Sequence, residues 1–221
     1  LRAAAATLAS GTVTVCITAD LSRPGAGEKL FATCRKSRLK VGVLVNNAGA
    51  GLPARAQVRH NMQETRGLFQ LNCAAPLELA TLFGREMAAR GAGAILNVAS
   101  TAAYQPMPGS ALYGAGKAFL LSLSEAMHVE LRNKGIIVTA VCPGVTDTNF
   151  FKHGRPRVPE WLYPFLSAEH VAKKAVRALE RGKASTIPSF RHWLIAQLPR
   201  LLPRRLMLSL MRIVEKKRKG A

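Results

Sequence analysis

The sequence predicts an α/β protein built on a doubly wound parallel sheet, and three observations favour that fold class. First, short runs rich in β-branched residues alternate along the chain with longer stretches of helical character. Second, these short runs are apolar throughout, which is typical of strands covered by helices on both faces. Third, each run ends in small or polar residues, as expected where a ligand crosses the carboxyl edge of such a sheet.

The expected elements follow from this alternation. Four stretches are predicted as parallel strands, namely 12–18 (TVTVCIT), 41–46 (VGVLVN), 93–98 (GAILNV) and 135–141 (GIIVTAV). Helices are predicted at roughly 25–38, 60–90 and 110–134. Ser110 is a suitable N-cap for the third helix, and Gly135 is a suitable residue to end it.

The chain of 221 residues is long enough for one well-filled domain, which we assign to residues 1–190. A basic, amphipathic segment follows at 191–221, with nine Lys or Arg residues and a single acid. Pro199 and Pro203 are expected to divide it into short helices. The alanine-rich opening at 1–10 is predicted to be helical and not a signal peptide. The chain has no apolar run long enough to predict a membrane-spanning helix.

The formal net charge of +20 raises nucleic acid and anionic membrane as partners beside simple solubility. Nucleic acid is not expected, because the chain shows neither a basic motif interleaved with aromatic residues nor a recognition helix. The four cysteines, Cys16, Cys34, Cys73 and Cys142, form no C-x-x-C pair. We expect free thiols in a reducing compartment, the cytoplasm, and no metal site.

The stretch YGAGK, from Tyr113 to Lys117, places a phenol and an ammonium four residues apart. On a helix these positions share one face, so both side chains can reach a single site. A nearby positive charge favours phenolate and makes the tyrosine a better acid near neutral pH. A shift from about 10 to about 7 requires roughly 4 kcal/mol, which one charge at about 4 Å supplies. Among the three tyrosines, only Tyr113 has this spacing.

Small and polar residues gather where the four predicted strands end. Turn chemistry explains any one of these ends by itself, but four together favour a nucleotide lying across the sheet edge. In chain order, the residues are Asp20, then Asn46, Asn47, Ala48 and Gly49, then Ser100, then Pro143, Gly144, Thr146 and Thr148.

These residues resemble the classical short-chain dehydrogenases/reductases over about Gly11 to Thr148. NNAG follows a predicted strand, as it does in that family. Ser100 lies thirteen residues before Tyr113, and Tyr113 lies four before Lys117, which are the family's spacings. Asn72 lies 28 residues before Ser100, where the family has a catalytic asparagine.

The resemblance implies a Rossmann-like, three-layer fold and an enzyme that transfers a hydride between NADP or NAD and a carbonyl or alcohol substrate, with NADP preferred. It implies that Tyr113 is the acid in reduction and the base in oxidation, and that Ser100 stabilises the substrate oxygen. Lys117 would lower the pKa of Tyr113 and bind the nicotinamide ribose. Asn72 would hold a water that relays protons.

The resemblance also implies a cofactor site. Asp20 would contact adenine, and Asn47, Ala48 and Gly49 would line the adenosine ribose. Pro143, Gly144, Thr146 and Thr148 would close over the nicotinamide. The family's glycine-rich turn, T-G-x-x-x-G-x-G, does not occur in this sequence. We therefore expect a chain that lacks an amino-terminal β-α-β unit, whose helix N-terminus would hold the pyrophosphate.

The remaining expectations concern partners and rival functions. The aromatic segment 150–166 favours an apolar carbonyl substrate or, equally, a filled core beneath a long loop; its His153 is expected at the surface. Residues 203–219 carry an apolar stripe of Leu206, Leu210, Ile213 and Val214. They are expected to make peripheral membrane contact or, equally, to cover a subunit interface or their own domain. A homo-oligomer is also expected. A catalytically inactive scaffold of the same fold stays open as the alternative, with a nucleic-acid-binding protein below it.

Overall fold

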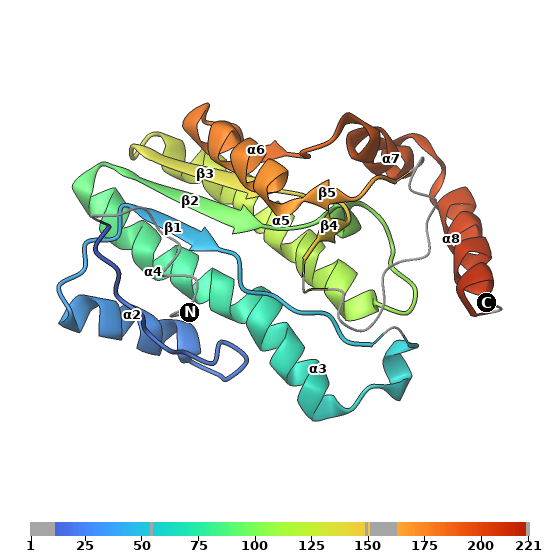
Figure 1. The fold of residues 1–221 in the computed structure, drawn as a ribbon, viewed down its shortest axis with the longest axis horizontal. Coiled ribbons are helices and arrows are strands. Elements are labelled where there is room, and N and C mark those ends of the chain that lie inside the picture. Colours follow the sequence, from blue (N-terminus) through green and yellow to red (C-terminus); the bar gives the residue numbers. More distant parts are fainter. Residues whose placement is uncertain (1–11, 54, 149, 151–162, 220–221) are drawn as a thin grey trace.

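A computed structural model describes residues 12–53, 55–148, 150 and 163–219. Its main sheet contains β1 (Val43–Asn46), β2 (Gly93–Val98), β3 (Ile136–Val141) and β6 (Ser185–Thr186). The larger helices are α2 (Ala26–Lys36), α3 (Met62–Phe69), α4 (Ala75–Arg90), α5 (Ala111–Arg132), α6 (Ala168–Glu180), α7 (Phe190–Leu201) and α8 (Arg204–Lys219). The predicted α/β fold class is confirmed, since helices α4 and α5 pack on one side of the parallel sheet and α6 on the other (Figure 1).

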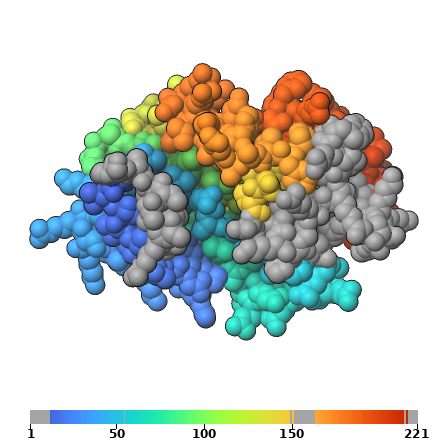
Figure 2. All heavy atoms as spheres, viewed as in Figure 1, coloured from blue at the N-terminus to red at the C-terminus, as the bar shows by residue number. Residues whose placement is uncertain are grey.

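The strand order is β1-β2-β3-β6, and every pairing is parallel. The carboxyl ends of the strands therefore lie along one edge, with Asn46 beside Asn97 and Val98 beside Val141. Beyond this edge, β4 (Thr146–Asp147) pairs with β5 (Leu166–Ser167) in a small second sheet. In the space-filling view, α6 (orange) and α3 (teal) lie on opposite sides of the molecule (Figure 2).

The predicted strand at 12–18 is wrong, because these residues carry no strand pairing. A strand is stabilised by the hydrogen-bond ladder to its neighbour. Among the described residues, β1 pairs only with β2, so the segment has no ladder to join. Ile17 still packs against the core, whereas Val13 is 91% exposed. The apolar side chain of Ile17 therefore packs residues 12–18 against the domain, although these residues form no strand.

The predicted helix at 60–90 is interrupted. Between α3 and α4 the chain forms a π-helical turn at Gln70–Ala74, which carries Asn72 inward to 2% exposure. Such single π-turns inside helices often occur at functional sites. The third helix begins at Ala111 as expected, but the side chain of Ser110 makes no capping hydrogen bond. Gly135, in the left-handed region, follows its end.

The tail differs from expectation at one proline. Pro203 separates α7 from α8, as predicted, but Pro199 lies inside α7. A proline removes one backbone hydrogen bond of a helix and strains the preceding turn. Pro199 is only two residues from the end of α7, so the helix loses little by containing it. The side chains of Val214 and Lys216–Lys219 lie outside the described part of the chain, as do residues 1–11 and the aromatic-segment residues Phe151, His153 and Trp161.

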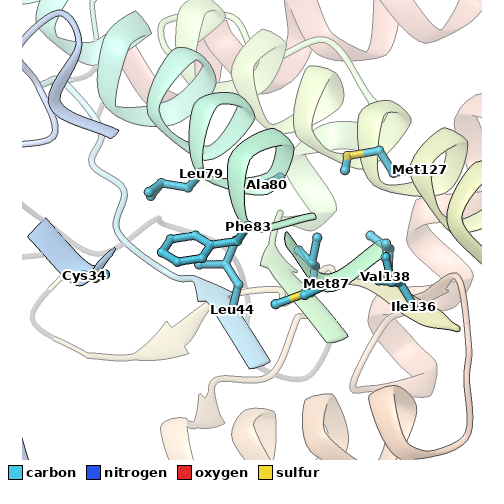
Figure 3. Close-up of a cluster of buried hydrophobic side chains, with 10 residues drawn as sticks. Cys34, Leu44, Leu79, Ala80, Phe83, Met87, Met127, Ile136 and Val138 are labelled. Carbon is cyan, nitrogen blue, oxygen red and sulfur yellow. The ribbon is translucent and has the colours of Figure 1, made fainter. Parts of the chain in front are cut away.

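The main hydrophobic core lies between the sheet and helices α4 and α5 (Figure 3). Phe83 and Met87 of α4 pack there against Leu44 of β1, and Ile136 and Val138 of β3 close the other end. The helix α2 joins this core through an edge-to-face contact between Phe31 and Phe83, whose ring centroids lie 5.0 Å apart. The core thereby holds the strands in register beneath the site edge.

A buried polar chain ties the strand ends to α5. The Asn46 amide donates to Asn97 Oδ1 at 2.9 Å, and the Asn97 amide donates to Ser124 Oγ at 2.8 Å. Asn97 and Ser124 are fully buried, so leaving either one unpaired would cost about 1–3 kcal/mol. This chain fixes β1, β2 and α5 relative to one another.

Candidate active site

Helix α5 carries Tyr113 and Lys117 on one face, as their spacing predicts. Lys117 is 5% exposed, and its ammonium donates to the Val98 carbonyl of β2 at 2.7 Å. Its Nζ lies 5.8 Å from the centroid of the Tyr113 ring. The end of β2 thus determines where the ammonium lies relative to the phenol.

Ser100 lies two residues beyond β2, at the start of a 3-10 turn at Thr101–Tyr104. Its hydroxyl accepts from the Ala102 amide at 3.1 Å and donates to the Pro143 carbonyl at 3.4 Å. The Ser100 hydroxyl also lies near the Tyr113 phenol and lowers its pKa. The two hydroxyls are therefore brought together at the carboxyl edge of the sheet.

Asn72 joins this group from the π-turn. Its side chain forms two hydrogen bonds with the backbone of Ala50, accepting from the amide at 3.2 Å and donating to the carbonyl at 2.9 Å. A Cβ placed on Gly49 would lie 3.2 Å from Asn72 Oδ1 and 3.4 Å from Lys117 Nζ. The loop after β1, the π-turn and α5 consequently meet at Gly49, where any larger residue would crowd both polar atoms.

The electrostatics of the site differ from the sequence-based expectation. Burial raises the pKa of Tyr113, and the nearby Ser100 hydroxyl opposes this rise without overcoming it. Burial also lowers the pKa of Lys117, from 10.5 to about 8. The Lys117 ammonium is turned toward the Val98 carbonyl, and the shift of the Tyr113 pKa is caused by burial and by the Ser100 hydroxyl. Desolvation is thus the dominant influence on both groups.

The cysteines around the site are poor nucleophiles. Burial raises the pKa of Cys73, and it raises the pKa of Cys142 to about 12. Both are free and buried, as Cys34 is, whereas Cys16 is exposed. Thiols this far from ionisation pack as small apolar groups at neutral pH. Among the described residues, no group of three His, Cys, Asp or Glu side chains is placed to hold a metal ion.

The segment predicted to cover the nicotinamide follows β3. Pro143 is buried, and its carbonyl accepts from the Thr101 amide at 2.9 Å. The Thr146 hydroxyl donates to the Gly144 carbonyl at 3.2 Å, while Thr148 is exposed. The segment predicted to cover the nicotinamide is thereby attached to the 3-10 turn that Ser100 caps. The predicted nicotinamide residues and the predicted catalytic residues therefore adjoin each other.

Of the residues predicted to hold the adenosine, Gly49 adjoins Asn72 and Lys117, and the other three lie at the surface. Asp20, Asn47 and Ala48 are exposed. Asp20 accepts from the backbone and hydroxyl of Ser22, which are the main causes of its lowered pKa. Asn47 and Ala48 line an apolar cavity of about 240 Å³ beside β1, with Leu21, Leu44, Phe83 and others.

Two aromatic side chains also border the catalytic residues. The Phe150 ring lies 5.6 Å from the Tyr113 ring, measured between centroids. The Tyr163 hydroxyl hydrogen-bonds Thr101 Oγ1. Both residues belong to the aromatic segment that the sequence singles out. The Tyr163 ring rests on His192 of α7, with centroids 4.0 Å apart. Sequence reasoning missed His192, because a single histidine in a basic tail forms no recognisable pattern.

A doubly wound parallel sheet with a polar site at its carboxyl edge defines a class of α/β proteins that bind ligands at that edge. The family model of the short chain dehydrogenases matches residues 1–158. The chain therefore belongs to the short chain dehydrogenase family, which confirms the family expectation.

Individual relatives agree with this assignment. The chain is 30% identical over 173 residues to 17-beta-hydroxysteroid dehydrogenase type 3 of Mus musculus, covering 77% of this chain and 54% of the relative. It is 31% identical over 169 residues to the very-long-chain 3-oxoacyl-CoA reductase of Bos taurus, covering 75% and 52%. The chain thus spans about half the length of these relatives.

Solved structures match over a larger share of their length. A short-chain dehydrogenase from Sphingobium yanoikuyae in complex with NADPH superimposes with a TM-score of 0.73 at 30% identity, covering 82% of this chain and 70% of that one. A bulky-bulky ketone specific alcohol dehydrogenase from Comamonas testosteroni gives 0.67 at 32% identity, covering 84% and 70%. These similarities support the observed fold.

Proposed function

We propose that this chain is the catalytic part of an NAD(P)-dependent oxidoreductase that interconverts a carbonyl compound and its alcohol, with NADP as the preferred cofactor. The observation that carries the proposal is the convergence of Ser100, Tyr113, Lys117 and Asn72 at one sheet edge. No side chain can donate a hydride, so the cofactor would supply that chemistry. Asp20, Asn47, Ala48, Gly49, Pro143, Gly144, Thr146 and Thr148 would hold it.

The chain's own residues would manage the proton and the substrate oxygen. In reduction, Tyr113 would donate its proton to that oxygen, while the Ser100 hydroxyl stabilises the charge that develops there. A high pKa suits Tyr113 to this role, because the phenol stays protonated until the oxygen becomes basic. Lys117 Nζ lies 5.8 Å from the centroid of the Tyr113 ring and would bind the ribose, while Asn72 would hold a water that restores the proton of Tyr113.

The substrate is proposed to be an apolar, bulky carbonyl compound. Phe150 lies beside Tyr113 and is 42% exposed, so it offers an apolar wall next to the proton donor. The similarity to an alcohol dehydrogenase described as specific for bulky ketones and to a hydroxysteroid dehydrogenase supports this substrate class. Extended acyl substrates are the next class to test, because a 3-oxoacyl-CoA reductase is also similar.

The test measures oxidation of NADPH and NADH by the purified full-length protein with a panel of aryl ketones, steroid ketones and aldehydes. Tyr113→Phe should lower kcat by about 10²–10⁴, since the ring stays while the proton donor is lost. Tyr104→Phe is the matched control, because the Tyr104 hydroxyl bonds only the Cys142 sulfur among the hydrogen bonds recorded for the described residues. Full activity of Tyr113→Phe would refute the mechanism, and no turnover with any substrate would favour the scaffold alternative.

We also propose that residues 203–219 make peripheral contact with an anionic membrane. Leu206, Leu210 and Ile213 of α8 are exposed at helical spacing, and Phe190 and Trp193 of α7 stack beside each other with Trp193 45% exposed. None of the helices in the described part of the chain has the length and apolar character to cross a membrane. An amphipathic, basic helix instead suits a position in the interface.

Vesicle binding tests this contact. Binding should require anionic lipid, weaken as salt rises, and disappear when 203–221 is deleted while the domain at 1–190 stays folded. Val129→Glu is the control, because Val129 is 74% exposed but lies on α5. Equal binding by the truncated chain would refute the membrane role.

Assembly into a homo-oligomer is proposed on separate grounds. Phe69, Leu77 and Phe119 are exposed apolar side chains on the helices and turn from α3 to α5. Burying such side chains against a second copy would favour association. Light scattering should report an oligomer that Phe119→Glu dissociates, and a monomeric wild-type protein would exclude it.

A further inference from the structure

His192 differs from the other histidines of the described chain. It is fully buried, and neither ring nitrogen has a hydrogen-bond partner among the described residues. His60, His128 and His170 each have a hydrogen bond through a ring nitrogen. Burial lowers the pKa of His192, which keeps the ring neutral, and the Pro164 carbonyl opposes this shift without making a well-formed hydrogen bond. The ring therefore meets its described neighbours through packing contacts.

Those contacts reach the catalytic edge by two routes. The first is direct, because the His192 ring lies against the bare Cα of Gly144. A Cβ on Gly144 would overlap the ring atoms Nδ1 and Cε1. The ring therefore occupies the space into which the Pro143–Gly144 turn would otherwise move.

The second route runs through a phenol. The Tyr163 ring rests on His192, and the Tyr163 hydroxyl bonds Thr101 Oγ1. The Thr101 hydroxyl also lies 3.3 Å from the Pro143 carbonyl, to which Ser100 Oγ donates at 3.4 Å. His192 thus supports a corner that contains Ser100, Thr101 and the Pro143–Gly144 turn, directly at Gly144 and through Tyr163 at Thr101.

We propose that His192 is a positioning residue, whose ring supports Gly144 and Tyr163 and so fixes the Ser100 hydroxyl against Tyr113. This inference rests on the proposed function, since it assigns a purpose to the position of Ser100. Close packing on both routes leaves the corner little freedom to shift. A displacement near 1 Å at a catalytic group lowers turnover by roughly 10²-fold, so a loose corner would be costly for activity.

The test compares ring removal with ring retention in the full-length protein, with NADPH and the best ketone of the panel. His192→Ala should lower kcat by about 10-fold or more and leave the KM for ketone within about threefold, since the corner moves but the pocket remains. His192→Phe keeps a planar ring against Gly144 and Tyr163 and should restore kcat to within about threefold of wild type. His170→Ala is the control, because His170 is exposed on α6.

Two results would overturn the proposal. One is a folded His192→Ala protein with wild-type kcat, which would make the histidine a simple core residue. The other is a His192→Phe protein as slow as His192→Ala, which would mean that the ring nitrogens act. If His192→Ala does not fold, Tyr163→Phe decides instead: losing its bond to Thr101 should cost about fivefold in kcat, and wild-type kcat would refute the proposal. Failure of the proposed function itself is distinguishable, because the wild-type protein would then turn over no substrate, or Tyr113→Phe would keep full activity.

Discussion

The two halves of the carboxyl edge differ in how their polar residues are held. At β2, β3 and α5, Ser100 and Lys117 are tied to backbone carbonyls, and Asn72 is tied to Ala50. In the adenosine half, Asp20, Asn47 and Ala48 are exposed, and Asn47 and Ala48 border an apolar cavity beside β1. The reactive half is thus internally fixed, whereas the adenosine half is open.

This difference follows from the sheet. Strands β2 and β3 pair on both sides, so their ends and the residues after them are held in register. Strand β1 pairs only with β2 in the described part of the chain, and its Val43 and Val45 are about half exposed. Substitutions in the reactive half should therefore change kcat, and substitutions beside β1 should change cofactor affinity.

The largest effect is expected at Ser100. Ser100→Ala removes the donor that would stabilise the substrate oxygen, and such a loss costs about 10²–10³ in turnover. Cofactor affinity should hardly change, because Ser100 faces the phenol of Tyr113. Steady-state kinetics with varied ketone and varied NADPH separate these effects. If Ser100→Ala raised only the KM for NADPH, the proposed separation between a reactive half and a cofactor-binding half would be wrong.

A smaller but still large effect is expected at Gly144. Gly144→Ala places a methyl group into the His192 ring, so the turn or α7 must shift. We expect kcat to fall by about 10–10² and stability to fall by about 1–3 kcal/mol. Gly42→Ala before β1 is the matched control, because a Cβ there meets nothing within 4 Å. Equal loss in both variants would show that the crowding at Gly144 is not the cause.

Lys117 gives a pH-dependent effect on stability. Burial lowers its pKa from 10.5 to about 8, so between these values the unfolded chain binds more protons than the folded chain. The free energy of unfolding contributed by this group therefore rises with pH across that window. Lys117→Met should be more stable than wild type by about 3 kcal/mol at pH 7, less whatever the lost bond to Val98 contributes.

Urea unfolding at several pH values measures this difference. The advantage of Lys117→Met should shrink as pH rises from about 8 toward 10.5, because the wild-type lysine loses its buried charge. Leu112→Met, on the same helix, controls for adding a methionine. If the stability difference does not depend on pH, burying the charge of Lys117 does not destabilise the folded protein.

Sequence reasoning predicted the reactive half better than its surroundings, for physical reasons. Short β-branched runs determined β1, β2 and β3 to within two residues, because they form locally recognisable strands. Spacing alone placed Tyr113 and Lys117 on one helix face. The strand at 12–18 was wrong, because strand formation depends on a partner that a local pattern does not reveal.

Three other features depend on contacts between distant segments. The π-turn at Gln70–Ala74 allows Asn72 to reach Ala50, and no residue type announces it. Lys117 turns to Val98 because the end of β2 lies beneath α5, a relation absent from the YGAGK motif. His192 is brought to Gly144 only by the path of α7. Tertiary packing therefore decides what propensity and spacing leave open.

The smallest effect is expected at Asp20, which tests the open half directly. Asp20 is exposed and hydrogen-bonded to Ser22, so it contributes little to folding. If Asp20 contacts adenine, Asp20→Ala should raise the KM for NADPH by about threefold to tenfold and leave kcat unchanged. A change of this size corresponds to the loss of one modest hydrogen bond. Glu169→Ala, at an exposed ion pair on α6, is the matched control for removing an acid. Kinetics with saturating ketone and fluorescence titration with NADPH measure the change. An unchanged KM would show that Asp20 does not bind the cofactor. A fall in kcat would show that the reactive half and the adenosine half are coupled.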